Sequence, residues 1–142
     1  MVNLSCINTL NHSCRNLDSV PAELIQNSSL RLSGVQKLDL SFNSISSLED
    51  LSFEKFSSLK ELMLNDNQIN ELPYHSINRC KLLRILNISH NQLKTLPPIS
   101  SPNYILARGN PLQIISSQFR NIDKIEFINF DWLDYLVDSV SS

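Results

Sequence analysis

Glycine, long apolar runs and an excess of positive charge are all missing from this chain of 142 residues. With only Gly34 and Gly109, it lacks the glycine-rich loop that cradles phosphates. Its apolar runs fall short of the roughly 20 residues that a membrane-spanning helix needs. The formal net charge of −2 offers no basic excess for a phosphate backbone. These features argue against nucleotide binding, membrane insertion and nucleic acid as the main partner.

Cysteine is scarce as well, and its pattern predicts neither a disulfide framework nor a metal site. Cys6, Cys14 and Cys80 are odd in number and none stands at CxxC spacing. Cys80 falls on an apolar position of the repeat described below, so we expect a buried thiol. Cys6 and Cys14 would pair only in an oxidising compartment. The histidines lie far apart, and HExxH, GxSxG and Walker patterns are missing, so we predict no metal, no cofactor and no catalytic residue.

What the chain does contain is a repeat of 24 residues. Segments 35–48, 59–72 and 83–96 carry apolar residues at matching positions, and Asn43, Asn67 and Asn91 recur in phase with them. Leu38 and Leu40 alternate at period two, as in a short strand. A single repeat buries too little apolar surface to fold alone. We therefore expect the strands to stack into one parallel sheet over a continuous core.

The pattern LxxLxLxxNxLxxL resembles that of the leucine-rich repeat superfamily, and the 24-residue period resembles its typical class. The resemblance covers residues 35–115 clearly and the flanks in weakened form. It implies an α/β fold: a right-handed solenoid in a short horseshoe arc, with a parallel sheet on the concave face and short helices or irregular chain on the convex side. We assign Asn43, Asn67, Asn91 and Asn110 a structural role, with side-chain amides that bond backbone groups in the turn leaving the sheet.

The flanks predict how the single structural domain is organised. We divide it into a cap and degenerate first repeat at 1–34, the repeats at 35–115, and a last strand with a helical cap at 116–142. A shorter fourth unit places Ile105 and Ala107 at the strand positions, and a fifth strand is expected at 125–127. Residues 131–140, with Trp132, form one apolar helical face. This C-terminal helix either seals the last repeat or docks a partner or a second copy of the chain.

Function is expected on the concave sheet face, the surface with which such solenoids bind. A solvated face would be polar, but Met63, Ile85, Tyr104 and Leu106 form an apolar group that suggests an interaction site. Incidental exposure, or coverage by neighbouring chain, is the competing interpretation. The predicted partner-binding residues are Lys37, Asp39, Phe42, Glu61, Met63, Asp66, Ile85, Asn87, His90, Tyr104, Leu106 and Arg108.

Three functional classes fit this pattern. The favoured one is a cytoplasmic protein–protein interaction module, an adaptor or regulatory scaffold with another protein as its partner and no enzymatic activity. The N-terminus does not read as a secretory signal, and a glycan on the sequon at Asn87 would obstruct the sheet face. The second is the ligand-binding fragment of a secreted or cell-surface receptor, which would be extracellular and predicts a disulfide between Cys6 and Cys14. The third is the targeting domain of a larger enzyme, such as a ubiquitin-ligase effector.

Overall fold

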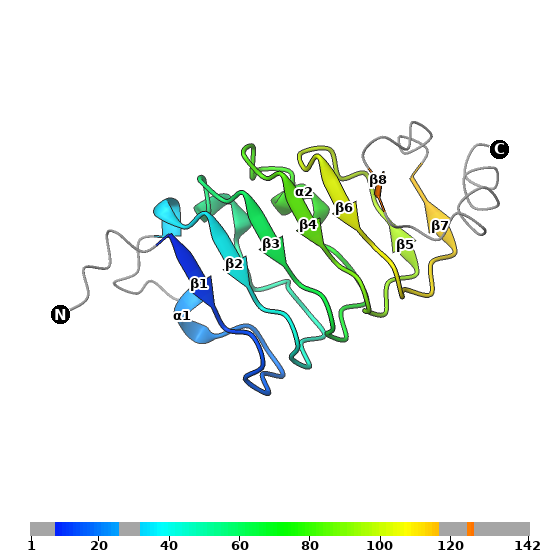
Figure 1. Ribbon diagram of the computed structural model, residues 1–142, viewed down its shortest axis with the longest axis horizontal. Helices are drawn as coiled ribbons and strands as arrows, with labels where there is room; N and C mark the ends of the chain where they lie inside the picture. The colour runs from blue at the N-terminus through cyan, green and yellow to red at the C-terminus, as the bar shows by residue number, and fades with distance from the viewer. Residues whose placement is uncertain (1–7, 26–31, 117–124, 127–142) are drawn as a thin grey trace.

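The computed structural model describes residues 8–25, 32–116 and 125–126. Six strands form one parallel sheet in the order β1-β2-β3-β4-β6-β8 (Figure 1). They are β1 (Thr9–Asn11), β2 (Lys37–Asp39), β3 (Glu61–Met63), β4 (Ile85–Asn87), β6 (Tyr104–Leu106) and β8 (Ile125–Glu126). A second parallel sheet joins β5 (Thr95–Leu96) to β7 (Ile114–Ile115). Each repeat thus contributes one strand to the main sheet, as the period predicts.

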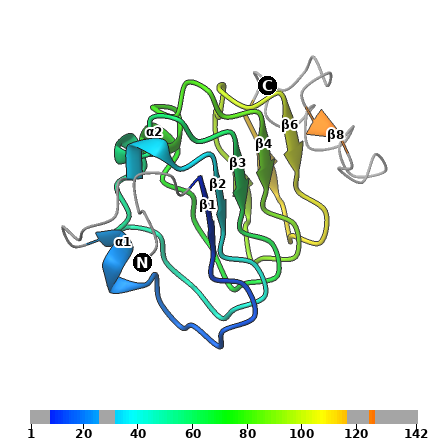
Figure 2. The same cartoon turned by 60° about the vertical axis from the view of Figure 1, so that its left-hand side comes forward.

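Short helices lie on the other side of the core from the main sheet (Figure 2). They are α1 (Ala22–Ile25), η2 (Leu32–Gly34), η3 (Phe53–Lys55) and α2 (Tyr74–Ile77). None exceeds four residues, and a helix this short is not stable by itself in water. Phe53 in η3 and Ile77 in α2 are fully buried, so packing against the core holds these turns in place. The predicted convex side of short helices and irregular chain is therefore confirmed.

The core is a continuous stack of apolar side chains between the sheet and the helices. The strand-centre residues Leu38, Leu62, Leu86 and Ile105 follow one another in register and are fully buried. Cys80 belongs to this core, where its thiol donates to the carbonyl oxygen of Phe53 at 3.3 Å. Burial raises the pKa of that thiol to about 11. Cys80 is thus a protonated core residue, as predicted.

A side-chain amide closes the turn that follows each of the strands β2, β3, β4 and β6. Asn67 Nδ2 donates to the carbonyl oxygens of Leu40 at 2.9 Å and Leu64 at 3.1 Å, while its Oδ1 accepts from the backbone N–H of Ile45 at 3.0 Å. Asn43, Asn91 and Asn110 bond in the same way. Each amide therefore ties its own repeat to the preceding one and satisfies backbone groups that the sheet no longer pairs.

The residue just before each of these asparagines has a positive φ. Phe42, Asp66 and His90 lie between 56° and 59°, and Gly109 lies at 77°. L-residues other than glycine rarely adopt this left-handed region, at a cost of about 1 to 2 kcal/mol. The turn imposes the conformation, because three different side chains adopt it at the same place in the repeat. Only at Gly109 does the residue type suit it without strain.

The two ends differ from the middle of the solenoid. Leu96 pairs with Ile115 and Ile85 pairs with Tyr104, which confirms the alignment proposed for the shorter fourth unit. Strand β8 lies at the start of the predicted fifth strand. Cys6 and the predicted helix at 131–140 lie outside the described residues. Cys14 is described, and its thiol is exposed and free.

Candidate functional site

The outward positions of the main sheet form two ladders of neighbouring side chains. Parallel pairing places Lys37, Glu61, Ile85 and Tyr104 next to one another in that order. The second ladder contains Asp39, Met63, Asn87 and Leu106. Most of the residues predicted to bind a partner are therefore neighbours on a single face. Phe42, Asp66, His90 and Arg108 stand beyond the strand ends, in the turns described above.

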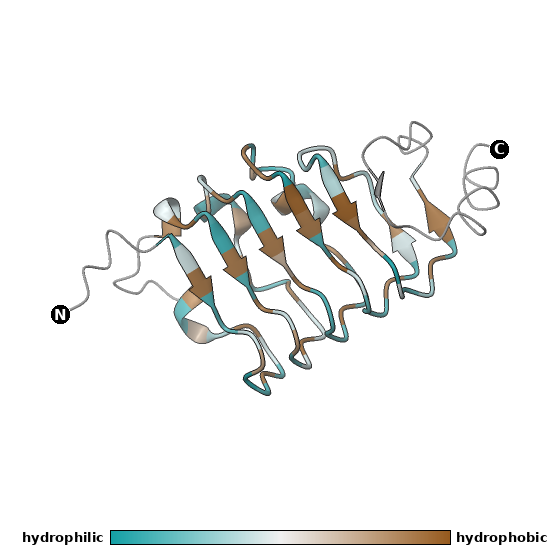
Figure 3. Ribbon diagram, viewed as in Figure 1, coloured by the Kyte–Doolittle hydropathy of each residue, from teal (hydrophilic) through white to brown (hydrophobic). Residues whose placement is uncertain are grey.

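The half of this face over β4 and β6 is apolar. Ile85 pairs with Tyr104, and Leu106 stands beside Asn87. The side chain of Tyr104 is 44% exposed, while Ile85, Leu106 and the nearby Met63 are half-buried. In Figure 3, β4 begins with hydrophobic residues, whereas β2 and β3 begin with hydrophilic ones. We refer to Ile85, Tyr104 and Leu106 as the apolar cluster.

A shallow, open depression adjoins the apolar cluster at the exits of β4 and β6. It is lined by Ser89, His90, Leu106 and Arg108. The backbone N–H of His90 donates to the carbonyl oxygen of Arg108 at 2.7 Å, which aligns the two turns. The imidazole of His90 lies directly over Gly109, where an added Cβ would stand 2.3 Å from Nδ1. Glycine at 109 thus allows the imidazole to lie beside Arg108.

Arg108 supplies an exposed cation to this depression. Within the described part of the chain, ion pairs join His12 to Glu23 and Arg79 to Glu54, and no carboxylate lies within 4 Å of the Arg108 guanidinium. A guanidinium keeps its charge at all ordinary pH values and presents a planar set of N–H donors. The depression therefore combines an unpaired cation, an imidazole and an apolar wall.

Three Asx side chains at outward positions of the sheet are each paired with a serine two residues further on. Asp39 Oδ1 accepts from the hydroxyl of Ser41 at 2.6 Å and from the Ser41 N–H at 2.9 Å. Asn11 with Ser13 and Asn87 with Ser89 repeat this arrangement. Met63 and Leu106 stand in the position of the acceptor in their own repeats. Strands β3 and β6 therefore carry an apolar outward residue where β1, β2 and β4 carry an Asx–Ser pair.

Charge along the chain is segregated in a way that reasoning from the net charge missed. No acidic residue stands between Glu71 and Asp123, yet this stretch holds half of the lysines and arginines. Those cations are Arg79, Lys81, Arg84, Lys94, Arg108 and Arg120. Counting charges along the sequence would have revealed it. The stretch includes β4 and β6, so the apolar cluster lies in the basic part of the molecule.

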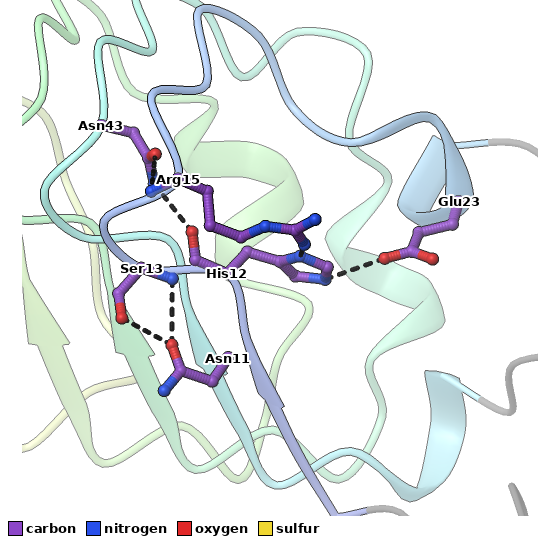
Figure 4. A network of polar contacts seen from close by, with 6 residues as sticks. All are labelled: Asn11, His12, Ser13, Arg15, Glu23 and Asn43. Carbon is purple, nitrogen blue, oxygen red and sulfur yellow. Dashed lines mark hydrogen bonds and ion pairs between the residues drawn. The ribbon is translucent and has the colours of Figure 1, made fainter.

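Sequence reasoning also missed a polar cluster in the first repeat (Figure 4). The N–H of His12 donates to the carbonyl of Asp39 just as the N–H of Leu40 donates to that of Met63, so His12 occupies a core position. It is only 6% exposed. Its Nε2 lies 3.0 Å from Glu23 Oε1, and Arg15 Nη1 lies 2.7 Å from its Nδ1. Aligning Leu10 and His12 with Leu38 and Leu40 would have found it.

Burial and charge together set the protonation state of His12. Burial lowers the pKa of the imidazole, the Glu23 carboxylate opposes that shift, and the Arg15 guanidinium adds to it. The neutral ring then accepts from Arg15 at Nδ1 and donates to Glu23 from Nε2. This arrangement fixes the turn between β1 and α1, which gives His12 a structural role.

Other kinds of site receive no support from the described residues. Across residues 8–25 and 32–116, no three His, Cys, Asp or Glu side chains gather as a metal ion would require. In the same parts of the chain, no helix has the length and apolar character to cross a membrane. The face of the main sheet is therefore the best candidate for a functional site.

Comparison with known proteins agrees with the architecture. Residues 33–93 match the family model described as leucine rich repeat. A leucine-rich repeat protein of Leptospira interrogans is 24% identical with a TM-score of 0.69, over 89% of this chain and 32% of that one. The leucine-rich repeat domain of APL1B is 22% identical with a TM-score of 0.58, over 70% of this chain and 27% of that one. No curated protein sequence matches. The chain spans about a third of the first of these structures.

Proposed function

We propose that this chain, whose residues 33–93 match the leucine rich repeat family model, is a protein–protein interaction module that binds its partner through the face of the main sheet. The observation that carries this proposal is the apolar cluster. Ile85, Tyr104 and Leu106 are neighbours on an outward face, although a solvated sheet face would be polar. Contiguous apolar side chains rimmed by polar groups are typical of binding sites. The chain has no catalytic role in this proposal.

The rigidity of the scaffold also supports binding at this place. The backbone of β4 is paired on both sides, with β3 and β6, and the asparagine amides fix the turns beyond the strands. Side chains on such a backbone are held in position before a partner arrives, which reduces the entropy lost on binding. Tyr104 and Arg108 are of the residue types that most often dominate binding energy.

We further propose that the module acts as a cytoplasmic adaptor or regulatory scaffold. Asn87 lies between Met63 and Leu106 on the sheet, so a glycan on its amide would cover the apolar cluster. Mass spectrometry of the native chain, before and after reduction and deglycosylation, tests this placement. A Cys6–Cys14 disulfide or a glycan at Asn87 would favour the receptor alternative instead.

The binding site is tested with two matched double variants of the full chain. Met63→Glu with Tyr104→Glu introduces two carboxylates on the sheet face. Leu82→Glu with Ile114→Glu introduces the same charge at two exposed apolar residues elsewhere, which are 52% and 53% exposed. Circular dichroism and thermal unfolding establish that both variants are folded. Each protein is then immobilised, and bound proteins from a cell lysate are quantified by mass spectrometry.

We expect specific partners to bind the native chain and the Leu82/Ile114 variant, and to be lost from the Met63/Tyr104 variant. A loss of at least tenfold is expected, because a hot-spot side chain contributes about 2 kcal/mol. Partners that remain bound to the Met63/Tyr104 variant would exclude the sheet face. If the native chain captures nothing above empty beads, the proposal of a binding module fails.

A further inference from the structure

Building on the proposed function, we infer that the partner segment is extended, acidic and partly apolar, with one carboxylate paired to Arg108 and an adjacent apolar side chain on the apolar cluster. The depression at Ser89, His90, Leu106 and Arg108 would receive the carboxylate. Ile85 and Tyr104 would contact the apolar side chain one step further along the strands. The charge around β4 and β6, the geometry of the depression and the acidic residues on β2 and β3 all favour such a segment.

The charge argument starts from the acid-free stretch between Glu71 and Asp123. Arg84 directly precedes β4, and its carbonyl oxygen accepts from the N–H of Tyr104 at 2.9 Å. Arg108 stands two residues beyond β6. Both arginine side chains are exposed, so they mark opposite ends of the apolar cluster. A ligand that lies along these strands meets a cation at each end and apolar side chains between them.

The geometry favours a carboxylate at the Arg108 end. A guanidinium binds a carboxylate through two parallel N–H···O bonds, and such charge-assisted bonds are shorter and stronger than neutral ones. None of the acidic side chains that the structure describes pairs with Arg108. The imidazole of His90, held over Gly109, lies at the rim of the same depression.

A phosphate backbone is the less suitable ligand. Nucleic-acid binding depends on several cations that follow a chain of phosphates, and it is supported by stacking on several aromatic rings. The face over β4 and β6 offers two arginines separated by Ile85, Leu106 and a single ring, that of Tyr104. A protein segment with alternating side chains fits this spacing better, because alternate residues of an extended chain point to the same side.

The other half of the face would reject the same ligand. Asp39 and Glu61 lie on β2 and β3, and Asp66 follows β3. Lys37 is the cation among these outward positions, and it pairs in register with Glu61. An acidic segment placed across β2 and β3 would therefore be repelled. This repulsion restricts it to β4 and β6, and like-charge contacts of this kind are a common source of specificity.

The test uses a defined probe, a phage-displayed library of random dodecapeptides selected on the full chain at low salt. The expected result is enrichment of peptides in which Asp or Glu stands one or two residues from Leu, Ile or Phe. Synthetic copies of the enriched peptides are then measured by fluorescence anisotropy on the native chain and on Arg108→Glu. We expect Arg108→Glu to weaken binding by more than tenfold, since it replaces an attraction by a repulsion.

Two further variants separate the role of Arg108 from a general effect of charge. Lys94→Glu makes the same change in net charge at an exposed cation of the same stretch, away from the sheet face, and is expected to change binding less than twofold. Arg108→Lys keeps the charge but removes the planar pair of donors, so an intermediate loss is expected. Raising the salt concentration should weaken the native complex more than that of Arg108→Glu.

The outcomes distinguish this inference from the proposed function. Neutral or basic peptides that bind the native chain but not the Met63/Tyr104 variant would overturn the inference and leave the binding face intact. Peptides that bind the Met63/Tyr104 variant equally well would overturn both. If Lys94→Glu and Arg108→Glu weakened peptide binding equally, Arg108 would have no specific role in binding. A library without enriched peptides, or preferential binding of a fluorescent oligonucleotide through Arg108, would also contradict the inference.

Discussion

The two halves of the main sheet have the same backbone and different outward side chains. Strands β1 to β3 and strands β4 and β6 pair in one continuous parallel register, and the same asparagine amides bind their turns. Over β2 and β3 the face is charged, whereas over β4 and β6 it is apolar with arginines at its ends. The inward positions are apolar in both halves except at His12. The repeat therefore constrains the core strongly and leaves the outward positions free to specialise.

The largest effect is expected where the two halves are alike, at the asparagine amides. Asn91→Ala would leave the carbonyl oxygens of Leu64 and Ile88 and the N–H of Ile69 without their partner, in buried surroundings. We expect a loss of about 3 kcal/mol in the free energy of unfolding. Urea unfolding followed by circular dichroism measures it. Asn70→Ala, at an exposed asparagine outside the turns, is the control and should change stability by less than about 0.5 kcal/mol.

Asn43→Ala sharpens this comparison in the first half. Its amide makes the same kind of bonds but is only half-buried, so water can replace part of them. The expected loss is smaller than that of Asn91→Ala. If Asn43→Ala proved as costly as Asn91→Ala, burial would not be what determines the contribution of these amides.

A smaller effect on stability is expected at Gly109. It lies in the second half, where glycine takes the turn position that Phe42, Asp66 and His90 occupy in the other repeats. Gly109→Ala combines the positive φ of 77° with a Cβ placed 2.3 Å from His90 Nδ1. We expect a destabilisation of about 2 kcal/mol, from backbone strain and displacement of the imidazole. In the double variant His90→Ala with Gly109→Ala, the steric part should disappear and the backbone part should remain. Thermal unfolding of the four proteins forms a double-mutant cycle, and additive effects would show that the imidazole does not lie over Gly109.

A pH effect near neutrality is expected in the first half, at His12. Because burial lowers the pKa of His12 below its ordinary value of 6.5, the unfolded chain binds a proton more readily than the folded one. The stability contributed by the neutral imidazole is complete above pH 6.5 and declines as the pH falls through the pKa of the folded state. The difference in unfolding free energy between the native chain and His12→Leu should therefore shift with pH between 7 and 5, in favour of His12→Leu at low pH. A difference independent of pH would show that His12 titrates normally.

The smallest effect is expected at Phe42. This exposed side chain stands at a φ of 56°, so glycine would relieve backbone strain but increase the entropy of the unfolded chain. The two contributions nearly cancel, and we expect Phe42→Gly to stabilise the protein by less than about 1 kcal/mol. Urea unfolding would measure the change. A marked destabilisation would indicate that the Phe42 ring packs against the turn.

The repeat allowed much of this fold to be predicted from the sequence, because its apolar period specifies the strands and their register. The pairing of Leu96 with Ile115 followed from that period even in the shorter unit. The identification of Ile85, Tyr104 and Leu106 as outward neighbours followed in the same way. A regular period assigns each residue to a face, and the register then determines its neighbours.

The features that could not be predicted depend on interactions outside the period. Leu10 pairs with Leu38, 28 positions later rather than the 24 of the regular repeat, so His12 was not recognised at a core position. The depression beside Arg108 depends on Gly109, which leaves room for the imidazole of a residue 19 positions earlier. Such a contact joins side chains of successive turns, and no pattern within one repeat encodes it.

The asparagine amides also have a consequence for how such a chain changes length. Each amide bonds to the turn of the preceding repeat and to its own turn. The contact between two repeats therefore depends on those two repeats alone. Inserting or deleting one whole unit of 24 residues would join the same kinds of surfaces again. Duplication of the repeat that contains β4 would then extend the apolar cluster, and the contacts between repeats would be of the kind already present. The gain of whole repeats can thus enlarge the binding surface while the fold is kept.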